Sequence, residues 1–207
     1  MTKPSNRHRT ALILGADNPA GRSIAMSLSR AGCNVVLAGY DVAKLKILAD
    51  LIEAKKGDPL VTAIPREAER VIPVLRAARE TMGHYHFVVN AISATDPPSD
   101  APHHFIDKAR DLQDKVWEVV EGRGSVRFVI LWPTSTDRAV PPIPDEKLWC
   151  TAVRYERIQL EADDDDPRAI RAAGAADTIV ALLAAPASAC PVEVRLAIRE
   201  LKSRPGE

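Results

Sequence analysis

The chain has 207 residues, of which 46% are apolar and 27% are charged, so it is long enough to bury the core of one large domain. Its 28 basic and 28 acidic residues cancel, which argues against a nucleic-acid partner or an anionic membrane surface, because both select a basic protein. Cys33, Cys150 and Cys190 form no CxxC pair, which argues against disulfides and zinc and favours a reducing cytoplasm.

The first elements are a strand and a helix joined by a glycine turn. Residues 10–14 form a short apolar run that ends at Gly15, which is typical of a parallel strand buried on both faces. Pro19 suits the first turn of a helix, apolar residues then recur every three to four positions, and Gly32 ends the run.

The same alternation continues through the next hundred residues. Residues 34–38 are predicted to form a second strand, and Asp41 can cap a helix that runs to Gly57. The following predicted elements are a weak strand at 60–64, a helix at about 66–82, a strand at 86–90, a helix at about 106–121 and a strand at 126–132.

Strands that alternate with helices predict an α/β protein with a three-layer, doubly wound Rossmann-type fold. Its sheet is expected to be mostly parallel, with right-handed connections and helices on both faces. In such a sheet, ligands bind in the loops at the carboxyl ends of the strands.

The chain is harder to interpret after Trp132. Four prolines between 133 and 144 predict a loop, and residues 145–161 fit either one helix or a short helix followed by a strand at 155–160. The carboxylates of Asp163 to Asp166 are expected to form a solvated turn rather than a metal site. A helix at 169–185 and a strand at 191–198 complete the predicted elements.

This alternation predicts a single Rossmann-like domain over residues 1–207. Flexible tails are expected at 1–9 and 199–207. Residues 1–10 are polar and basic and lack the apolar core of a secretory signal, and no apolar run is long enough to span a bilayer. We therefore expect neither a membrane nor a nucleic acid among its partners.

The turn between the first strand and the first helix is the most informative motif. It contains Gly15 and Gly21, so that backbone N–H groups and the positive end of the helix can face a pyrophosphate. The turn and its helix resemble the T-G-x-x-x-G-x-G segment of the short-chain dehydrogenase/reductase family and the Arg-x-Ile-Ala that follows it, with Gly15, Gly21, Arg22, Ile24 and Ala25 in register.

Two further segments strengthen this resemblance. Residues 35–39 resemble the second strand of the family, and residues 87–91 resemble its Asn-Asn-Ala-Gly segment after strand four. The resemblance implies NAD or NADP as cofactor and a binding site made of Gly15, Asp17, Asn18, Gly21, Tyr40, Asp41, Asn90 and Ala91. Within it, Tyr40 could stack on adenine or cover the sheet edge, and Asp41 could bind ribose or cap a helix.

The chain departs from the family pattern in the same turn. Leu14 replaces the usual threonine, and Pro19 replaces the middle glycine and removes one backbone N–H. Gly15 and Gly21 could therefore serve only the tight turn and the packing of helix on strand.

The family's catalytic groups are also missing. The resemblance implies a Tyr-x-x-x-Lys pair beyond strand five, where this chain has Leu148, Trp149 and Val153 instead. Tyr40 and Lys44 have the bare spacing but follow strand two. Ser135 is the nearest equivalent of the catalytic serine, and the pair of histidines at 103–104 is the alternative source of an acid.

Two functions follow from this pattern. The first is a non-catalytic or degenerate member of the fold, a pseudoenzyme that acts as a scaffold, a sensor or a subunit of a homo-oligomer or protein complex, with or without a bound dinucleotide. The alternative is a divergent NAD(P)-dependent short-chain oxidoreductase that reduces a small carbonyl compound. Because a fold does not fix function, the missing tyrosine and lysine favour the first.

Overall fold

The computed structural model describes ten ranges of the chain, and all structural statements below refer to them. These are residues 9–65, 70–92, 111–112, 114–116, 118–119, 126–133, 149–155, 158–159, 170–185 and 193–196.

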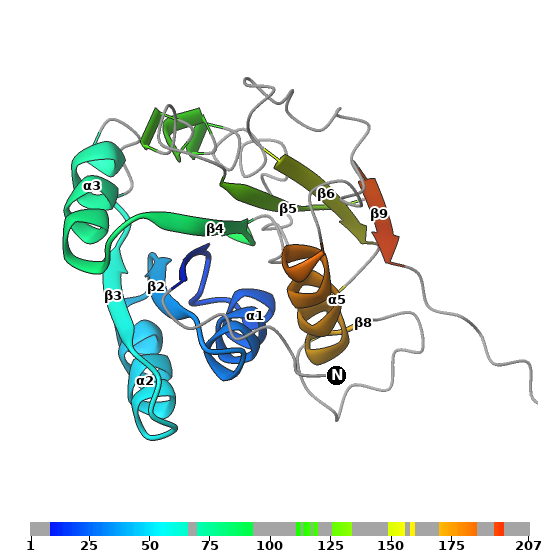
Figure 1. Cartoon of the computed structure of the whole chain (residues 1–207), viewed down its shortest axis with the longest axis horizontal. Helices are drawn as coiled ribbons and strands as arrows, with labels where there is room; N and C mark the ends of the chain where they lie inside the picture. The colour runs from blue at the N-terminus through cyan, green and yellow to red at the C-terminus, as the bar shows by residue number, and fades with distance from the viewer. Residues whose placement is uncertain are drawn as a thin grey trace, which may run out of the picture.

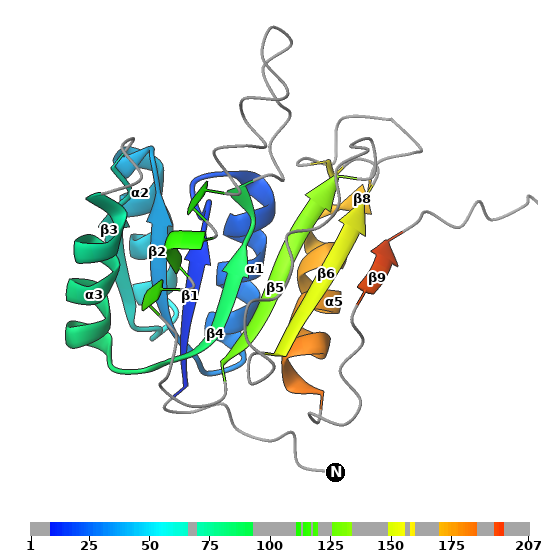
Figure 2. The same cartoon turned by 90° about the horizontal axis from the view of Figure 1, so that it is seen from above.

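A sheet of seven parallel strands forms the centre of the molecule (Figure 2). In spatial order it contains β3 (Pro59–Ala63), β2 (Asn34–Gly39), β1 (Thr10–Leu14), β4 (Tyr85–Asn90), β5 (Arg127–Pro133), β6 (Trp149–Tyr155) and β9 (Glu193–Leu196). Two short strands, β7 (Ile158–Gln159) and β8 (Ile170–Arg171), pair separately.

Helices cover both faces of this sheet (Figure 1). The helices α1 (Pro19–Arg30), α2 (Val42–Glu53) and α5 (Ala172–Ala184) lie on one face. The helix α3 (Val71–Met82) and the helical residues between 111 and 119 lie on the other. The arrangement confirms the predicted three-layer Rossmann-type fold.

The packing of the core explains why the sequence of a central strand such as β1 is an unbroken apolar run. Leu12 and Leu14 point into the cluster under α3, whereas Ala11 and Ile13 point into the cluster under α1, and none of the four is exposed to solvent. Both faces of β1 are therefore buried, as a parallel strand between two helical layers requires. On α1, Ile24 and Leu28 complete the second cluster.

The order of the strands fixes where a ligand can bind. From β1 the chain moves outward through β2 to β3, then returns to the opposite side of β1 with β4. Because successive connections diverge at this point, a crevice opens between the carboxyl ends of β1 and β4. This is the switch point at which nucleotides bind in doubly wound sheets.

Two predictions about the chain need correction. Residues 149–155 form a strand, so a single helix over 145–161 is wrong; of the alternative strand predicted at 155–160, residue 155 belongs to β6 and residues 158–159 to the separate short strand β7. Pairing with β5 and β9 on either side selects the strand, which an apolar run this short does not specify by itself. Arg9 also belongs to the folded part rather than the tail, because its carbonyl accepts a hydrogen bond of 2.9 Å from the N–H of Asn34.

The described residues contain neither a membrane helix nor a metal cluster. None of their helices is both long and apolar enough to cross a bilayer. No three His, Cys, Asp or Glu side chains among them gather in a metal-binding arrangement. Asp163 to Asp166 lie outside the described residues.

Candidate functional site at the carboxyl ends of the strands

The turn after β1 is held against β2 by its own backbone. Gly15 has φ +78°, a backbone conformation that residues other than glycine rarely adopt. Its N–H and that of Ala16 both donate to the carbonyl of Ala38, at 2.8 and 3.1 Å. The chain thus turns sharply at the end of the strand and enters α1 next to the sheet.

Two glycines allow this close approach. A Cβ atom built on Gly21 would overlap the carbonyl oxygen of Gly15, so any side chain there would push α1 off the turn. A Cβ on Gly15 would lie 2.9 Å from the backbone nitrogen of Ile92. Both glycines are therefore required for packing, which is one of the two roles that the sequence predicted for them.

Asn18 connects the turn to β4. It is the N-cap of α1, and its Oδ1 accepts a hydrogen bond of 2.9 Å from the N–H of Gly21. Its Nδ2 donates to the carbonyl of Ala91 at 2.7 Å, with the side chain 6% exposed. We predicted Asn18 to be a cofactor residue and missed this structural role, although asparagine before a helix-starting proline is a capping signal.

Asp17 connects the same turn to the end of β2. Its Oδ2 accepts hydrogen bonds from the N–H groups of Tyr40 and Asp41, at 2.8 and 2.9 Å. The carboxylate lies where a side chain on Gly39 would stand, since a Cβ built there would overlap Asp17 Oδ1. No local pattern in the sequence indicates this contact between residues 23 positions apart.

The segment after β4 closes the crevice from the other side. The N–H of Ala91 donates to the carbonyl of Leu14 at 2.9 Å. Asn90 is 2% exposed and its Oδ1 accepts a hydrogen bond of 3.2 Å from the N–H of Ile92. The structure thus brings together all eight residues that the sequence singled out, and we call them the carboxyl-end site: Gly15, Asp17, Asn18, Gly21, Tyr40, Asp41, Asn90 and Ala91.

The start of α1 presents donors to this site. Pro19 has no N–H, and the N–H of Gly21 is used by Asn18. The N–H groups of Asp17 and Ala20 have no acceptor among the described residues. No acidic side chain neutralises the first turn of α1. Free donors at the positive end of a helix favour an anion.

A cleft extends from the turn along the groove between α1 and α2. Its volume is about 540 Å³, and Asp17 and Asn18 line the end nearest the turn. Three cationic side chains also line it, Arg22, Arg30 and Lys44. The cleft therefore combines one carboxylate with an excess of positive charge.

At the end of β2, Asp41 has the capping role that the sequence favoured. Its Oδ1 accepts a hydrogen bond of 3.1 Å from the N–H of Lys44, and its Oδ2 lies 3.4 Å from Lys44 Nζ. The bond from the Lys44 backbone N–H is the main reason that the pKa of Asp41 lies below its usual range. Tyr40 is 42% exposed, so its ring is accessible at the rim of the site.

Tyr85 does not supply a catalytic acid at the site. Tyr85 lies in the core, where its hydroxyl donates to the carbonyl of Leu75 at 2.8 Å and burial raises its pKa. Trp149 and Val153, which stand near the expected tyrosine and lysine positions, belong to strand β6. Ser135 and the histidines at 103–104 lie outside the described residues.

The fold has many relatives among solved structures, whereas no family model matches the sequence. A metagenomic short-chain oxidoreductase in complex with NADP is similar with a TM-score of 0.70 and 15% identity, over 92% of this chain and 97% of that one. A 7α-hydroxysteroid dehydrogenase complexed with NADH and 7-oxo glycochenodeoxycholic acid is similar with a TM-score of 0.73 and 15% identity, over 95% and 96%.

A short-chain dehydrogenase from Rhodopseudomonas palustris is similar to the same degree. Its TM-score is 0.70 at 15% identity, with 92% of this chain and 98% of that chain covered. All three likenesses span nearly the whole length of both proteins. The chain therefore has the fold of the short-chain dehydrogenases and reductases, in agreement with the sequence-based resemblance.

Proposed function

We propose that this chain, which has the short-chain dehydrogenase/reductase fold, binds a nicotinamide dinucleotide at the carboxyl-end site and is a divergent oxidoreductase for a small carbonyl compound. The supporting observation is the start of α1, where the N–H groups of Asp17 and Ala20 have no acceptor among the described residues. They lie at the switch point of the sheet, beside two glycines that leave no room for a side chain.

Different residues of the carboxyl-end site would contact different parts of the cofactor. The N–H groups of Asp17 and Ala20 would hold the diphosphate at the positive end of α1, in the turn that Gly15, Asn18 and Gly21 shape. Tyr40 and Asp41 would contact the adenosine, with Asp17 beside them. Asn90 and Ala91 would line the crevice along which the cofactor extends. A bound dinucleotide would supply the hydride, and similar structures solved with NADP or NADH support this class of cofactor.

Ser135 is the residue we propose to orient the substrate carbonyl. It follows in the sequence two residues after β5, whose carboxyl end is at the same edge of the sheet as the carboxyl-end site. Its hydroxyl can donate a hydrogen bond to a carbonyl oxygen. If it does so, Ser135→Ala lowers kcat in a carbonyl-reduction assay, and a variant with unaltered kcat would remove Ser135 from the mechanism.

A second candidate function is a non-catalytic scaffold or sensor in the cytoplasm. It is favoured by the connection between β5 and β6, which consists of residues 134–148, fifteen in all. These fifteen residues contain no tyrosine, so the connection holds no Tyr-x-x-x-Lys pair.

The binding proposal is tested by thermal unfolding with NAD, NADH, NADP and NADPH at millimolar concentration. A ligand at 100 times its Kd adds about 2.7 kcal/mol to the stability of the folded state, so at least one of the four is expected to raise Tm by several degrees. Absence of a shift with all four contradicts the proposal.

The two candidate functions are separated by turnover. NADH or NADPH oxidation with a panel of small aldehydes and ketones is expected if the chain is an oxidoreductase. Binding without turnover favours the scaffold or sensor. That role also requires a protein partner or self-association, which light scattering after size-exclusion chromatography measures.

A further inference from the structure

The end of β2 has an acidic group that comes from a different part of the chain. Gly39 closes the strand and has no side chain. The carboxylate of Asp17, from the turn after β1, occupies the space in front of it, so closely that a Cβ on Gly39 would overlap Asp17 Oδ1. The turn after β1 therefore contributes its own negative charge to the adenosine side of the carboxyl-end site.

The two carboxylate oxygens of Asp17 have different partners. Oδ2 holds the N–H groups of Tyr40 and Asp41 at 2.8 and 2.9 Å, which fixes the position of the side chain. Within the described ranges, no donor is bonded to Oδ1. A carboxylate oxygen accepts up to two hydrogen bonds, so Oδ1 is a fixed acceptor at the end of β2.

This geometry distinguishes a ribose hydroxyl from a ribose phosphate. A hydroxyl can donate to Oδ1, whereas a phosphate has only acceptors and carries negative charge of its own. The two N–H groups that would otherwise receive a phosphate are already bonded to Oδ2. Lys44 is paired with Asp41. At the end of β2, the Asp17 carboxylate therefore repels a ribose phosphate.

We infer that Asp17 is the specificity-determining residue of the site, and that it selects NAD(H) over NADP(H). The inference rests on the proposed function, because it concerns the adenosine end of the same cofactor. It assigns the selection to the turn after β1 rather than to Asp41. Without the Asp17 carboxylate, the N–H groups of Tyr40 and Asp41 become available to a phosphate, and the cation Arg22 also lines the cleft.

The test is a titration of the protein with NADH and with NADPH, followed by dinucleotide fluorescence. For the wild type we expect NADH to bind at least about tenfold more tightly, the effect of one hydrogen bond to a charged group. Asp17→Asn and Asp17→Ser are expected to reduce the ratio about tenfold or more. Asp50→Asn, which removes an exposed carboxylate from α2, is the matched control and leaves the ratio unchanged.

The outcomes separate this inference from the proposed function. If both dinucleotides bind but the wild type shows no preference, or the Asp17 variants keep it, the inference is wrong and the binding site stands. A loss of preference in Asp41→Asn alone assigns the selection to Asp41 and also overturns it. If neither dinucleotide binds the wild type, the proposed function fails and the inference with it.

A measurement on the unmodified protein covers the case in which the Asp17 variants do not fold. Adenosine 5′-monophosphate and its 2′-phosphorylated form compete for the same site with bound NADH. The 2′-phosphorylated form is expected to compete at least about tenfold less well, and this difference shrinks as salt screens the Asp17 charge. Equal competition by the two nucleotides overturns the inference.

Discussion

The side-chain amide of Asn18 donates a hydrogen bond of 2.7 Å to the carbonyl oxygen of Ala91, 73 residues further along the chain. The same side chain accepts the N–H of Gly21 through its oxygen. One buried residue therefore caps α1 and also fixes the segment after β4 beside the turn after β1. This amide joins the two walls of the crevice, in addition to the bond from the Ala91 N–H to the Leu14 carbonyl.

Asn18→Ala is expected to destabilise the protein by about 2–4 kcal/mol, because it removes the cap and leaves the Ala91 carbonyl without its partner. Urea unfolding followed by circular dichroism measures the change. Asn18→Asp separates the two roles, since a carboxylate still caps the helix but cannot donate to Ala91. If Asn18→Asp is as stable as the wild type, the bond to Ala91 contributes nothing, and if the two variants lose the same stability, the cap contributes nothing.

Gly21→Ala is expected to destabilise the protein and to weaken dinucleotide binding, because the added methyl group would overlap the Gly15 carbonyl. We expect this overpacking to lower the free energy of unfolding by about 2–4 kcal/mol, which the change in Tm measures. An NADH titration measures the weaker binding. Gly174→Ala is the matched control on α5, where a Cβ meets no atom within 4 Å. This control substitution is expected to raise the free energy of unfolding by at most about 1 kcal/mol, because alanine favours a helix. Equal effects at the two positions would contradict the packing argument.

His86 makes the stability of the fold sensitive to mild acid. The pairing of β1 with β4 shifts register between Thr10 and Ala11, and His86 Nδ1 accepts the Thr10 N–H at 3.1 Å. Burial, with the charges of His84 and Arg9, lowers the pKa of His86 below its ordinary value of 6.5. The unfolded chain therefore takes up this proton first, and stability is lost as the pH falls from 6.5 through the lowered pKa.

We therefore expect the wild type to lose more stability than His86→Asn between pH 7.5 and 5.0. Asparagine keeps an acceptor near the Nδ1 position but does not titrate in this range. Urea midpoints at a series of pH values measure the difference. Parallel pH profiles for the two proteins would show that the pKa of His86 is the same in the folded and unfolded states, so that His86 has no role in acid unfolding.

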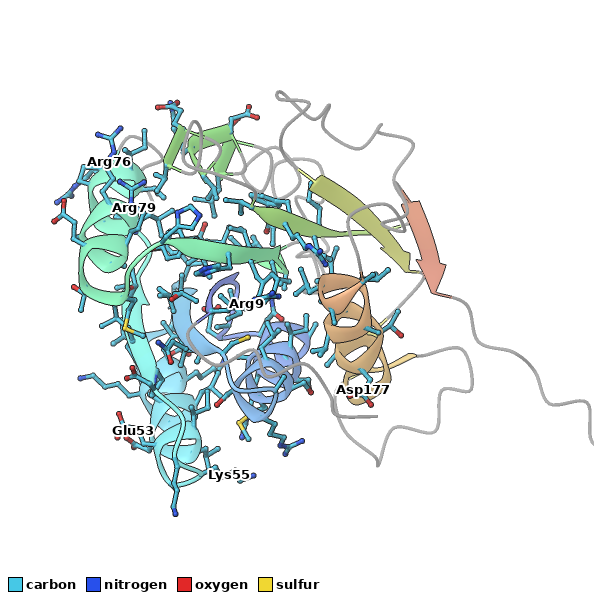
Figure 3. All side chains as sticks on the ribbon, viewed as in Figure 1. Arg9, Glu53, Lys55, Arg76, Arg79 and Asp177 are labelled. Carbon is cyan, nitrogen blue, oxygen red and sulfur yellow. The ribbon has the colours of Figure 1, made fainter. Side chains whose placement is uncertain are left out.

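Arg127 anchors the C-terminal end of α5 to the sheet. Its guanidinium Nη1 donates to the carbonyl of Leu183 at 2.6 Å and to that of Ala185. Arg127→Met keeps much of the apolar stem and removes both charge-assisted bonds, so we expect a loss of about 1–3 kcal/mol in urea unfolding. Arg76→Met, at an exposed position on α3 labelled in Figure 3, is the control and is expected to change stability by less than about 0.5 kcal/mol. Similar losses in the two variants would contradict the anchoring role.

The order of the elements could be predicted up to β5 because β1, β2 and β4 are almost wholly buried between the helical layers. The run at 10–14 is apolar throughout, and the glycine and proline that follow specify the turn and the start of α1. Asp41 before α2 is a capping signal that the structure confirms. These signals depend only on residues close together in the sequence.

Residues 149–155 were not identified as a strand for the opposite reason. The segment takes its conformation from pairing with β5 and β9, its neighbours on either side. Periodicity over so few residues does not distinguish helix from strand. The assignment of α5 to the face of the sheet that holds α1 likewise follows only from the assembled sheet.

The sequence by itself determined the Rossmann-type fold through its alternating strands and helices, and its resemblance to the short-chain dehydrogenase/reductase family singled out the eight residues of the carboxyl-end site. Only the tertiary structure decided what these residues do to one another. In it, the Asp17 carboxylate accepts hydrogen bonds from the N–H groups after β2, and the Asn18 amide donates one to the carbonyl after β4. Such bonds join segments that are distant in sequence, and they form only when parallel strands bring their carboxyl ends to one edge of the sheet.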